Sequence, residues 1–225
     1  MDAPIDAPID APVDAVLFDF DLTLADSTHA IANCTNHALQ QLGHQPVEAE
    51  RVRRVIGLPR AEMFRMLTGV EDAALQELFT NHFSAHADEV MASQTRLYQC
   101  VGPTLAALRQ RGARVGIISM KFRRRIEEIL RHAQQADAVD VIVGWEDVTR
   151  QKPHPEGLLL GLERLGVHSS RALYVGDHPF DAEAAHRAGV RFVGVRTGAT
   201  DEATWSSCTR LAIVDDVAGV LAYLR

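Results

Sequence analysis

One stretch near the start of the chain reads Ala15-Val16-Leu17-Phe18-Asp19-Phe20-Asp21-Leu22-Thr23, and its four leading apolar residues predict a buried strand. Asp19 and Asp21 follow at the end of that strand, and their spacing of two residues places both side chains on one face. Two carboxylates this close repel each other, which predicts a cation or strong hydrogen-bond donors beside them. A divalent cation such as Mg²⁺ prefers oxygen ligands, and a carboxylate so placed can also act as a nucleophile. From these residues alone, an Asp-rich turn without chemistry remains the alternative.

The composition is that of an ordinary soluble globular protein, with 47% hydrophobic and 24% charged residues. A length of 225 residues suits one domain, or one core with a small insert. The formal net charge of −7 argues against nucleic acid or an anionic membrane as a partner. The sequence contains neither a run of about 20 apolar residues nor a secretory signal pattern. Its three cysteines lie far apart without zinc-site spacing, so we expect a reducing, cytoplasmic location.

The first residues form a short tandem repeat in which Asp-Ala-Pro recurs every four positions up to Val13. Proline at every fourth residue is incompatible with a helix and unfavourable in a central strand. We therefore expect an extended, mobile tail over residues 1–12, with a partner-docking peptide as the alternative.

Apolar runs and helical patterns alternate along most of the chain. Such alternation predicts an α/β fold, with a Rossmann-like parallel sheet and helices on both of its faces. Ligands of open sheets of this kind bind beyond the carboxyl ends of the strands. The expected strands are 14–20, 113–119, 138–143, 171–176 and 191–195, and the expected helices are 101–112, 121–133, 155–166 and 180–188.

The interval between the first two expected strands, about ninety residues, is far too long for one crossover helix. Within it, apolar residues recur at helical spacing and strand patterns are almost absent. We therefore expect a helical cap over residues 27–96, inserted into a catalytic core made of residues 13–26 and 97–225. Such a cap can close over a substrate and exclude water, whereas the alternative is a purely structural helical subdomain.

Three further segments place polar residues after an apolar run or before a helix. The first is Val115-Gly116-Ile117-Ile118-Ser119, which ends in a hydroxyl, and the second is Lys152-Pro153-His154-Pro155, which places a lysine ahead of a proline-started helix. The third is Leu173-Tyr174-Val175-Gly176-Asp177-His178-Pro179-Phe180-Asp181, which ends in a pair of carboxylates. Together with the Asp19 segment, they resemble the four motifs of the haloacid dehalogenase-like hydrolase superfamily, from about Val13 to the C-terminus.

Two shorter segments resemble the phosphoglycolate phosphatase and pyrophosphatase branch of that superfamily. They are Ile56-Gly57-Leu58-Pro59 and Gly144-Trp145-Glu146-Asp147-Val148. The resemblance implies a Mg²⁺-dependent phosphatase that hydrolyses a small phosphorylated metabolite through an aspartyl-phosphate intermediate. Phosphoglycolate is a candidate substrate, and we expect a monomer or a homodimer.

The resemblance gives a role to each residue of the motifs. Asp19 is expected to attack phosphorus, and Asp21 to protonate the leaving oxygen and then activate water. Ser119 would donate its hydroxyl to the transferred phosphoryl group, while Lys152 would supply positive charge there or pair with Asp19. Thr23 is expected to orient the Asp19 loop. Without the resemblance, a strand-end cap for Ser119 and a solvated side chain for Lys152 remain open.

The same resemblance implies a Mg²⁺ ion held by carboxylate oxygens of Asp19 and Asp177 and by the backbone carbonyl of Asp21. Because Mg²⁺ keeps several waters among its ligands, three protein ligands are enough. Asp181 would orient this cluster from outside it. The alternative for Asp177 and Asp181 is a turn followed by a helix N-cap.

Several positions outside the central motif residues bear on the loop and on the substrate. Glycine is usual in the family at Leu22, and since leucine adopts positive φ only at a cost, we expect an ordinary backbone conformation there. Arg60 is a candidate for binding a carboxylate or second phosphate of the substrate, with an exposed helix charge as the alternative. The basic run 121–125 is expected to be a solvated helix face, and Trp145 and Trp205 are expected to be packing residues.

Three other functions share parts of this pattern. A phosphosugar mutase of the β-phosphoglucomutase type has the same core but returns the phosphoryl group to the sugar. A haloacid dehalogenase needs no metal, and both Asp21 and Asp177 argue against it. A non-catalytic binding protein on the same core is disfavoured because Asp19, Ser119 and Lys152 are all present.

Overall fold

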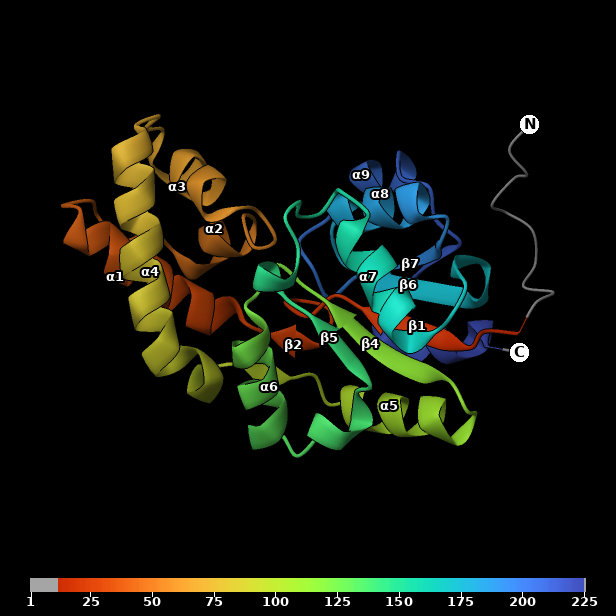
Figure 1. Cartoon of the computed structure of the whole chain (residues 1–225). Helices are drawn as coiled ribbons and strands as arrows, with labels where there is room; N and C mark the ends of the chain where they lie inside the picture. The colour runs from red at the N-terminus through yellow and green to blue at the C-terminus, as the bar shows by residue number, and fades with distance from the viewer. Residues whose placement is uncertain (1–11, 225) are drawn as a thin grey trace.

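The centre of the molecule is a six-stranded sheet in the order β5-β4-β1-β6-β7-β8, in which every pairing is parallel (Figure 1). The structure is a computed structural model that describes residues 12–224. The expected tail, apart from Pro12, therefore lies outside the described residues. The expected parallel α/β architecture is confirmed. The strands are β1 (Ala15–Phe18), β4 (Arg114–Ile118), β5 (Val141–Val143), β6 (Ala172–Gly176), β7 (Arg191–Val195) and β8 (Ala212–Val214).

The central strand, β1, lies between β4 and β6 and is covered on both faces. Its residues alternate between two apolar clusters, with Val16 and Phe18 on one side of the sheet and Ala15 and Leu17 on the other. This alternation is the period of two that a strand imposes on its side chains. All four side chains are fully buried, which explains why β1 is a continuous apolar run in the sequence.

Helices cover both faces of the sheet. Apolar residues of α5, α6 and η4 join the cluster that contains Phe18, whereas those of α7, α8 and α9 join the cluster that contains Leu17. No helix within residues 12–224 is long and apolar enough to cross a membrane. These helices are α5 (Val101–Gln110), α6 (Arg123–His132), α7 (Glu156–Leu165), α8 (Pro179–Ala188), α9 (Glu202–Ser206) and the 3-10 helix η4 (Val217–Tyr223), with short 3-10 turns η1 (Ala136–Ala138), η2 (Trp145–Asp147) and η3 (Ser169–Arg171) between them.

A group of helices stands beside the sheet, in the interval where the sequence predicts a cap (Figure 1). The chain enters and leaves this group through two short strands, β2 (Ala25–Asp26) and β3 (Arg96–Leu97), which pair antiparallel. Closure of the group over a substrate stays a prediction. Its members are α1 (Thr28–Gln41), α2 (Ala49–Arg53), α3 (Arg60–Thr68) and α4 (Ala73–Gln94).

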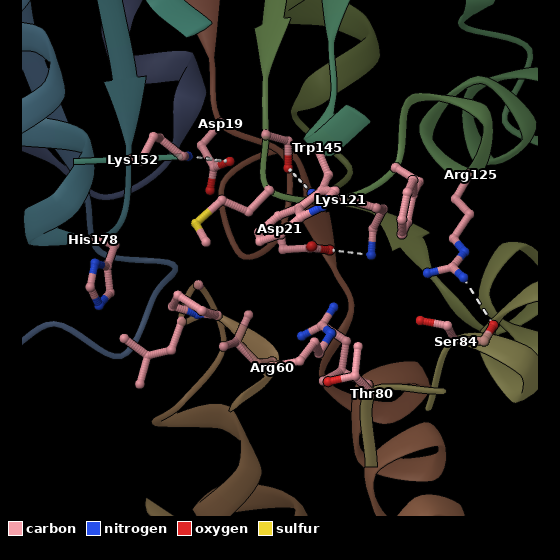
Figure 2. Close-up of a pocket in the computed structure, with 18 of the residues that line it drawn as sticks. Asp19, Asp21, Arg60, Thr80, Ser84, Lys121, Arg125, Trp145, Lys152 and His178 are labelled. Atoms are coloured by element: carbon pink, nitrogen blue, oxygen red, sulfur yellow. Dashed lines mark hydrogen bonds and ion pairs between the residues drawn. The ribbon is translucent and has the colours of Figure 1, made fainter. Parts of the chain in front are cut away.

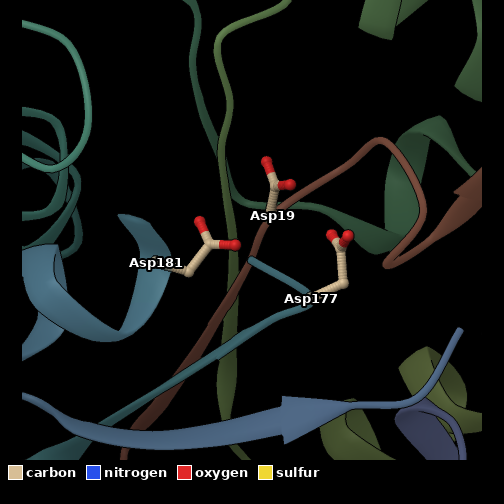
Figure 3. A group of neighbouring side chains, drawn as sticks. All are labelled: Asp19, Asp177 and Asp181. Carbon is tan, nitrogen blue, oxygen red and sulfur yellow. The ribbon is translucent and has the colours of Figure 1, made fainter. Parts of the chain in front are cut away.

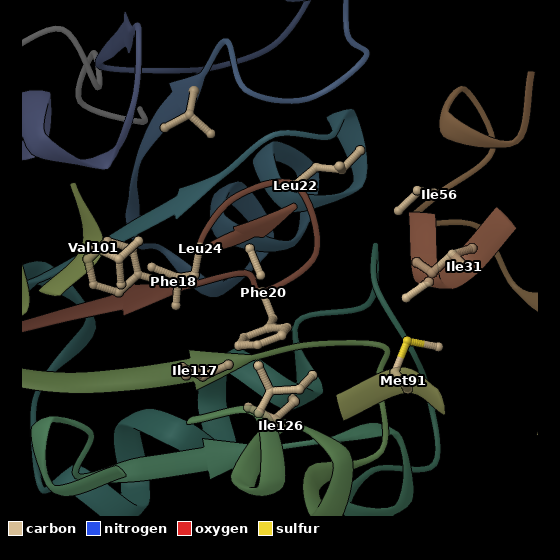
Figure 4. Packing of buried hydrophobic residues seen from close by; sticks show 14 of the residues in the cluster. Phe18, Phe20, Leu22, Leu24, Ile31, Ile56, Met91, Val101, Ile117 and Ile126 are labelled. Carbon is tan, nitrogen blue, oxygen red and sulfur yellow. The ribbon is translucent and has the colours of Figure 1, made fainter. Parts of the chain in front are cut away.

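The apolar cluster beneath the carboxyl ends of the strands continues into this group of helices (Figure 4). Phe20, in the loop after β1, belongs to the same cluster as Ile126 of α6. Ile31 of α1 and Met91 of α4 extend that cluster into the inserted helices. Side chains of both parts of the molecule therefore surround the loop that carries Asp21.

Candidate active site

The carboxyl ends of three neighbouring strands meet at one edge of the sheet, where the sequence motifs converge. Asp19 follows β1, Ser119 follows β4 and Asp177 follows β6, and each keeps 6% or less of its surface exposed. Lys152 reaches the same place from the turn ahead of α7, and its ammonium lies 2.8 Å from Asp19 Oδ1. Residues far apart in the sequence are thus gathered where parallel sheets bind their ligands.

Asp19, Asp177 and Asp181 form a buried carboxylate group, with one oxygen of each within 4.8 Å of the others (Figure 3). Burial, opposed by Lys152 but aided by Asp181 and Asp21, raises the pKa of Asp19 to about 7. Burial and the charges of Asp19 and Asp181 also raise the pKa of Asp177 well above its ordinary range. A cation would relieve this repulsion, and hard divalent cations such as Mg²⁺ take oxygen ligands of this kind.

Both oxygens of Asp181 accept hydrogen bonds. Oδ1 accepts from Lys152 Nζ at 2.6 Å and from the Tyr174 hydroxyl at 3.0 Å, while Oδ2 accepts from the His178 backbone N–H at 3.0 Å. Burial alone would lower the pKa of Lys152, but the charges of Asp181 and Asp19 outweigh it and raise that pKa well above its usual value. Asp181 therefore keeps the Lys152 ammonium charged and fixed at the edge of the sheet.

Thr23 ties the loop after β1 to Asp177. Its hydroxyl donates to Asp177 Oδ1 at 2.9 Å. The backbone carbonyl of Asp177 accepts from the Thr200 hydroxyl at 2.6 Å. A Cβ at Gly198 would lie 2.3 Å from Asp177 Oδ2, so any side chain there would displace the carboxylate. Two segments of the chain, the loop after β1 and the loop after β7, therefore fix the position of Asp177.

Leu22 has a φ of 62°, so the expectation of an ordinary backbone conformation at this position is wrong. The loop is held in this shape because Leu22 N–H donates to Ala25 O at 2.7 Å and Leu22 O accepts from the Thr197 hydroxyl at 2.6 Å. The leucine side chain is 1% exposed within the main apolar cluster. The left-handed conformation costs about 1–2 kcal/mol, whereas burial of a leucine contributes about 1.5–3 kcal/mol, so burial offsets the strain.

The basic run 121–125 is only in part the solvated helix face that the sequence predicts, because Arg123 and Arg124 are exposed whereas Lys121 and Arg125 are buried. Lys121 is 2% exposed and Arg125 is 3% exposed. Lys121 Nζ lies 2.8 Å from Asp21 Oδ1, and Arg125 Nε donates to Asp88 Oδ1 of α4 at 2.8 Å. The reason is tertiary, because the first turn of α6 packs against α4 instead of facing solvent. A single sequence shows the cations but not the helix that covers them.

A cavity of about 280 Å³ opens between the edge of the sheet and the inserted helices (Figure 2). Arg60 borders it from the start of α3, with its guanidinium 4.0 Å over the Phe83 ring, and burial lowers the pKa of this guanidinium to about 10. Trp145 lines the cavity too, which the expectation of a packing role missed, whereas Trp205 is buried as expected. The cavity is also lined by Asp19, Asp21, Ser119, Lys121, Arg125, Lys152, Thr80, Ser84, Phe122 and His178.

Comparison with known proteins places this site in a family. Residues 16–195, which include all four motif segments, match the model of a family described as haloacid dehalogenase-like hydrolase. A solved structure from Bacteroides fragilis, also described as a haloacid dehalogenase-like hydrolase, superposes with a TM-score of 0.88 at 39% identity. The match covers 92% of this chain and 99% of that one.

Two curated relatives match most of their own length. The N-acetylmuramic acid 6-phosphate phosphatase of Pseudomonas aeruginosa is 34% identical over 185 residues, which cover 82% of each protein. The phosphoglycolate phosphatase of Xanthomonas campestris pv. campestris is 30% identical over 197 residues, which cover 86% of this chain and 89% of the relative.

Proposed function

This chain belongs to the haloacid dehalogenase-like hydrolases and is a phosphatase of small phosphorylated metabolites, and we propose that it works through an aspartyl-phosphate on Asp19. The observation that carries the proposal is that Asp19 borders the cavity together with Asp21, Ser119 and Lys152. These four side chains supply the groups that phosphoryl transfer needs, namely a nucleophile, an acid and base, a neutral donor and a positive charge.

In the first step, a carboxylate oxygen of Asp19 attacks phosphorus, so that a bond to Asp19 forms and the bond to the leaving alcohol breaks. Asp21 gives its proton to the oxygen of that alcohol as it leaves. The Ser119 hydroxyl and the Lys152 ammonium contact the remaining phosphoryl oxygens, over which the transition state spreads its negative charge.

In the second step, water attacks phosphorus and the bond between phosphorus and Asp19 breaks. Asp21, ionised since the first step, takes a proton from this water, which makes the water a stronger nucleophile. Inorganic phosphate leaves, and both carboxyl groups return to their starting states. One residue thus serves as acid and then as base, so the two steps need a single well-placed proton carrier.

Mg²⁺ is the cofactor that we propose, with the carboxylates of Asp19 and Asp177 and the backbone carbonyl of Asp21 as its protein ligands. Support for the fit comes from the two buried carboxylates, whose pKa values are raised by burial and by the neighbouring acidic charges. Asp181 would stay outside the ligand set, because both of its oxygens already accept hydrogen bonds. When bound, Mg²⁺ would neutralise carboxylate charge and polarise a phosphoryl oxygen.

The alcohol part of the substrate would occupy the cavity beyond the phosphoryl group. Phosphoglycolate and N-acetylmuramic acid 6-phosphate, for which two relatives are named, are phosphate esters that also carry a carboxylate. We propose that Arg60 binds such a carboxylate, because its described contacts are the Phe83 ring and Met63 Sδ rather than an anion. A guanidinium can bind a carboxylate through two parallel hydrogen bonds.

Phosphate release from three esters tests this function: phosphoglycolate, N-acetylmuramic acid 6-phosphate and p-nitrophenyl phosphate. EDTA should abolish turnover and Mg²⁺ should restore it, whereas Ca²⁺ should support little reaction because its larger coordination shell misplaces the attacking oxygen. Arg60→Met should raise KM about tenfold for whichever carboxylate ester is the substrate, in line with the loss of a charged hydrogen bond. The same variant should leave KM for p-nitrophenyl phosphate unchanged. Full turnover after exhaustive chelation would contradict the Mg²⁺ proposal.

The mutase alternative differs only in the acceptor of the phosphoryl group. Incubation with β-glucose 1-phosphate separates the two activities, because a mutase forms glucose 6-phosphate whereas a phosphatase releases inorganic phosphate. We expect phosphate release without glucose 6-phosphate.

A further inference from the structure

Each of the two carboxylates after β1 is paired with its own ammonium group. Lys152 lies 2.8 Å from Asp19 Oδ1, and Lys121 lies 2.8 Å from Asp21 Oδ1. The side chain of Lys121 is only 1% exposed, and within residues 12–224 Asp21 is its one carboxylate partner. Taking an ammonium out of water is costly unless the pairing geometry is good. The function of Lys121 should therefore be sought at Asp21.

The two oxygens of Asp21 have different surroundings. Oδ1 accepts from the Lys121 ammonium and also from the Ser27 hydroxyl, which lies just ahead of α1. Oδ2 accepts no hydrogen bond from the part of the chain that the structure describes, and Asp21 borders the cavity. Because a carboxylate is planar, two donors on one oxygen also fix the direction of the other. Oδ2 is therefore held ready for a group that enters the cavity.

The ammonium of Lys121 points at Asp21 (Figure 2), and Lys121 is itself held at both sides of its backbone. Its N–H donates to Ser119 Oγ at 3.2 Å, and its carbonyl accepts from the Trp145 N–H at 3.0 Å. The approach of the Trp145 segment requires a glycine, since a Cβ at Gly144 would lie 2.4 Å from Arg123 N. The backbone segment between β4 and α6 that carries Lys121 is thus held in a fixed position.

We propose that Lys121 is a positioning residue for Asp21, which it anchors at Oδ1 together with Ser27 so that Oδ2 faces the oxygen of the leaving alcohol. This inference rests on the acid and base role proposed for Asp21. In this arrangement Lys152 serves the phosphoryl group, whereas Lys121 serves proton transfer to the leaving group.

Leaving-group dependence tests this role. A nitrophenolate leaves readily without a proton, whereas an unsubstituted phenolate needs one from Asp21. Lys121→Met should lower kcat/KM about threefold for p-nitrophenyl phosphate but at least about thirtyfold for phenyl phosphate, a part of what general acid catalysis contributes. Lys121→Arg keeps the cation but carries it on a larger, planar group, so it should recover only a part of the loss on phenyl phosphate. Ser27→Ala removes the second anchor and should show the same selective loss.

Arg124→Met is the matched control, because it removes an exposed cation of α6 that pairs with Asp88 rather than with Asp21. It should leave both rates unchanged. An equal loss on the two esters, or a change confined to KM, would overturn the positioning role. If Lys121→Met does not fold, the absence of a selective loss in Ser27→Ala overturns it as well. A wild-type protein inactive on both esters would instead refute the underlying phosphatase mechanism, so the two failures are distinguishable.

Discussion

Leu22 combines a strained backbone with a buried side chain, and two substitutions can separate the effects of these features on the stability of the protein. Leu22→Ala loses the side chain but keeps the unfavourable φ, and it should destabilise the protein by about 2–5 kcal/mol. Leu22→Gly also loses the side chain but removes the strain, so it should be about 1 kcal/mol more stable than the alanine variant. Urea unfolding measures both changes. An alanine variant more stable than the glycine variant would exclude strain at this position.

Asp19 offers a test of covalent catalysis. Asp19→Asn removes the attacking carboxylate and one proposed metal ligand together, so turnover should fall by about three orders of magnitude or more. The measurement is phosphate release, with circular dichroism to show that the variant is folded. A folded variant that keeps a tenth of the wild-type turnover would exclude Asp19 as the nucleophile.

The same substitution should change how stability depends on pH. The pKa of Asp19 is raised from 3.8 to about 7 in the folded protein, so ionisation of this carboxyl opposes folding. The cost grows as pH rises from about 4 to 7 and is constant above that range. In metal-free protein, the Tm of Asp19→Asn should therefore exceed that of wild type increasingly between these pH values. A larger difference at pH 4 than at pH 8 would contradict the raised pKa.

At the scale of elements, α2 is tied to the core by the arginine at its end. Arg53 Nη2 donates to Thr197 O at 2.6 Å, and Nη1 donates to Gly198 O at 3.2 Å. Arg53→Leu should loosen the inserted helices from this loop and lower kcat/KM about tenfold, as expected for losing hydrogen bonds from a charged donor. Arg51→Leu is the control, because Arg51 lies on the same helix but binds a carbonyl within the inserted helices. Equal effects of the two substitutions would contradict a tie between helix and core.

The length of a strand decides whether it can be predicted from the sequence. The strands β1 and β6 are runs of buried residues, as is β4 after its exposed first residue Arg114, and each lies inside a range predicted from the sequence. The edge strand β8 has three half-buried residues, which are too few to form a recognisable apolar run. β2 has only two residues and exists through its pairing with β3, a contact between distant segments. Such strands depend on their partners rather than on their own pattern.

At the scale of the whole molecule, the site too has parts that follow from the local sequence pattern and parts that depend on contacts between distant segments. Asp19, Ser119 and Asp177 could be predicted to meet because each follows a strand of one parallel sheet. The walls of the cavity could not, because they form where α6 and the loop before it meet the inserted helices. Lys121 is the clearest case, since a lysine in a basic run is usually solvated and only the covering helix buries it.

The central place of β1 also has a consequence for the order in which the protein folds. This strand is synthesised before its partners β4 and β6, which begin only at Arg114 and Ala172. Pairings so distant in sequence form slowly, whereas the helices between β2 and β3 contact one another across shorter stretches of chain and can form first. We expect β1 to remain an unpaired apolar strand on the ribosome until β4 emerges. The catalytic centre is thus completed only after β6 has been made, more than a hundred residues after its proposed nucleophile Asp19.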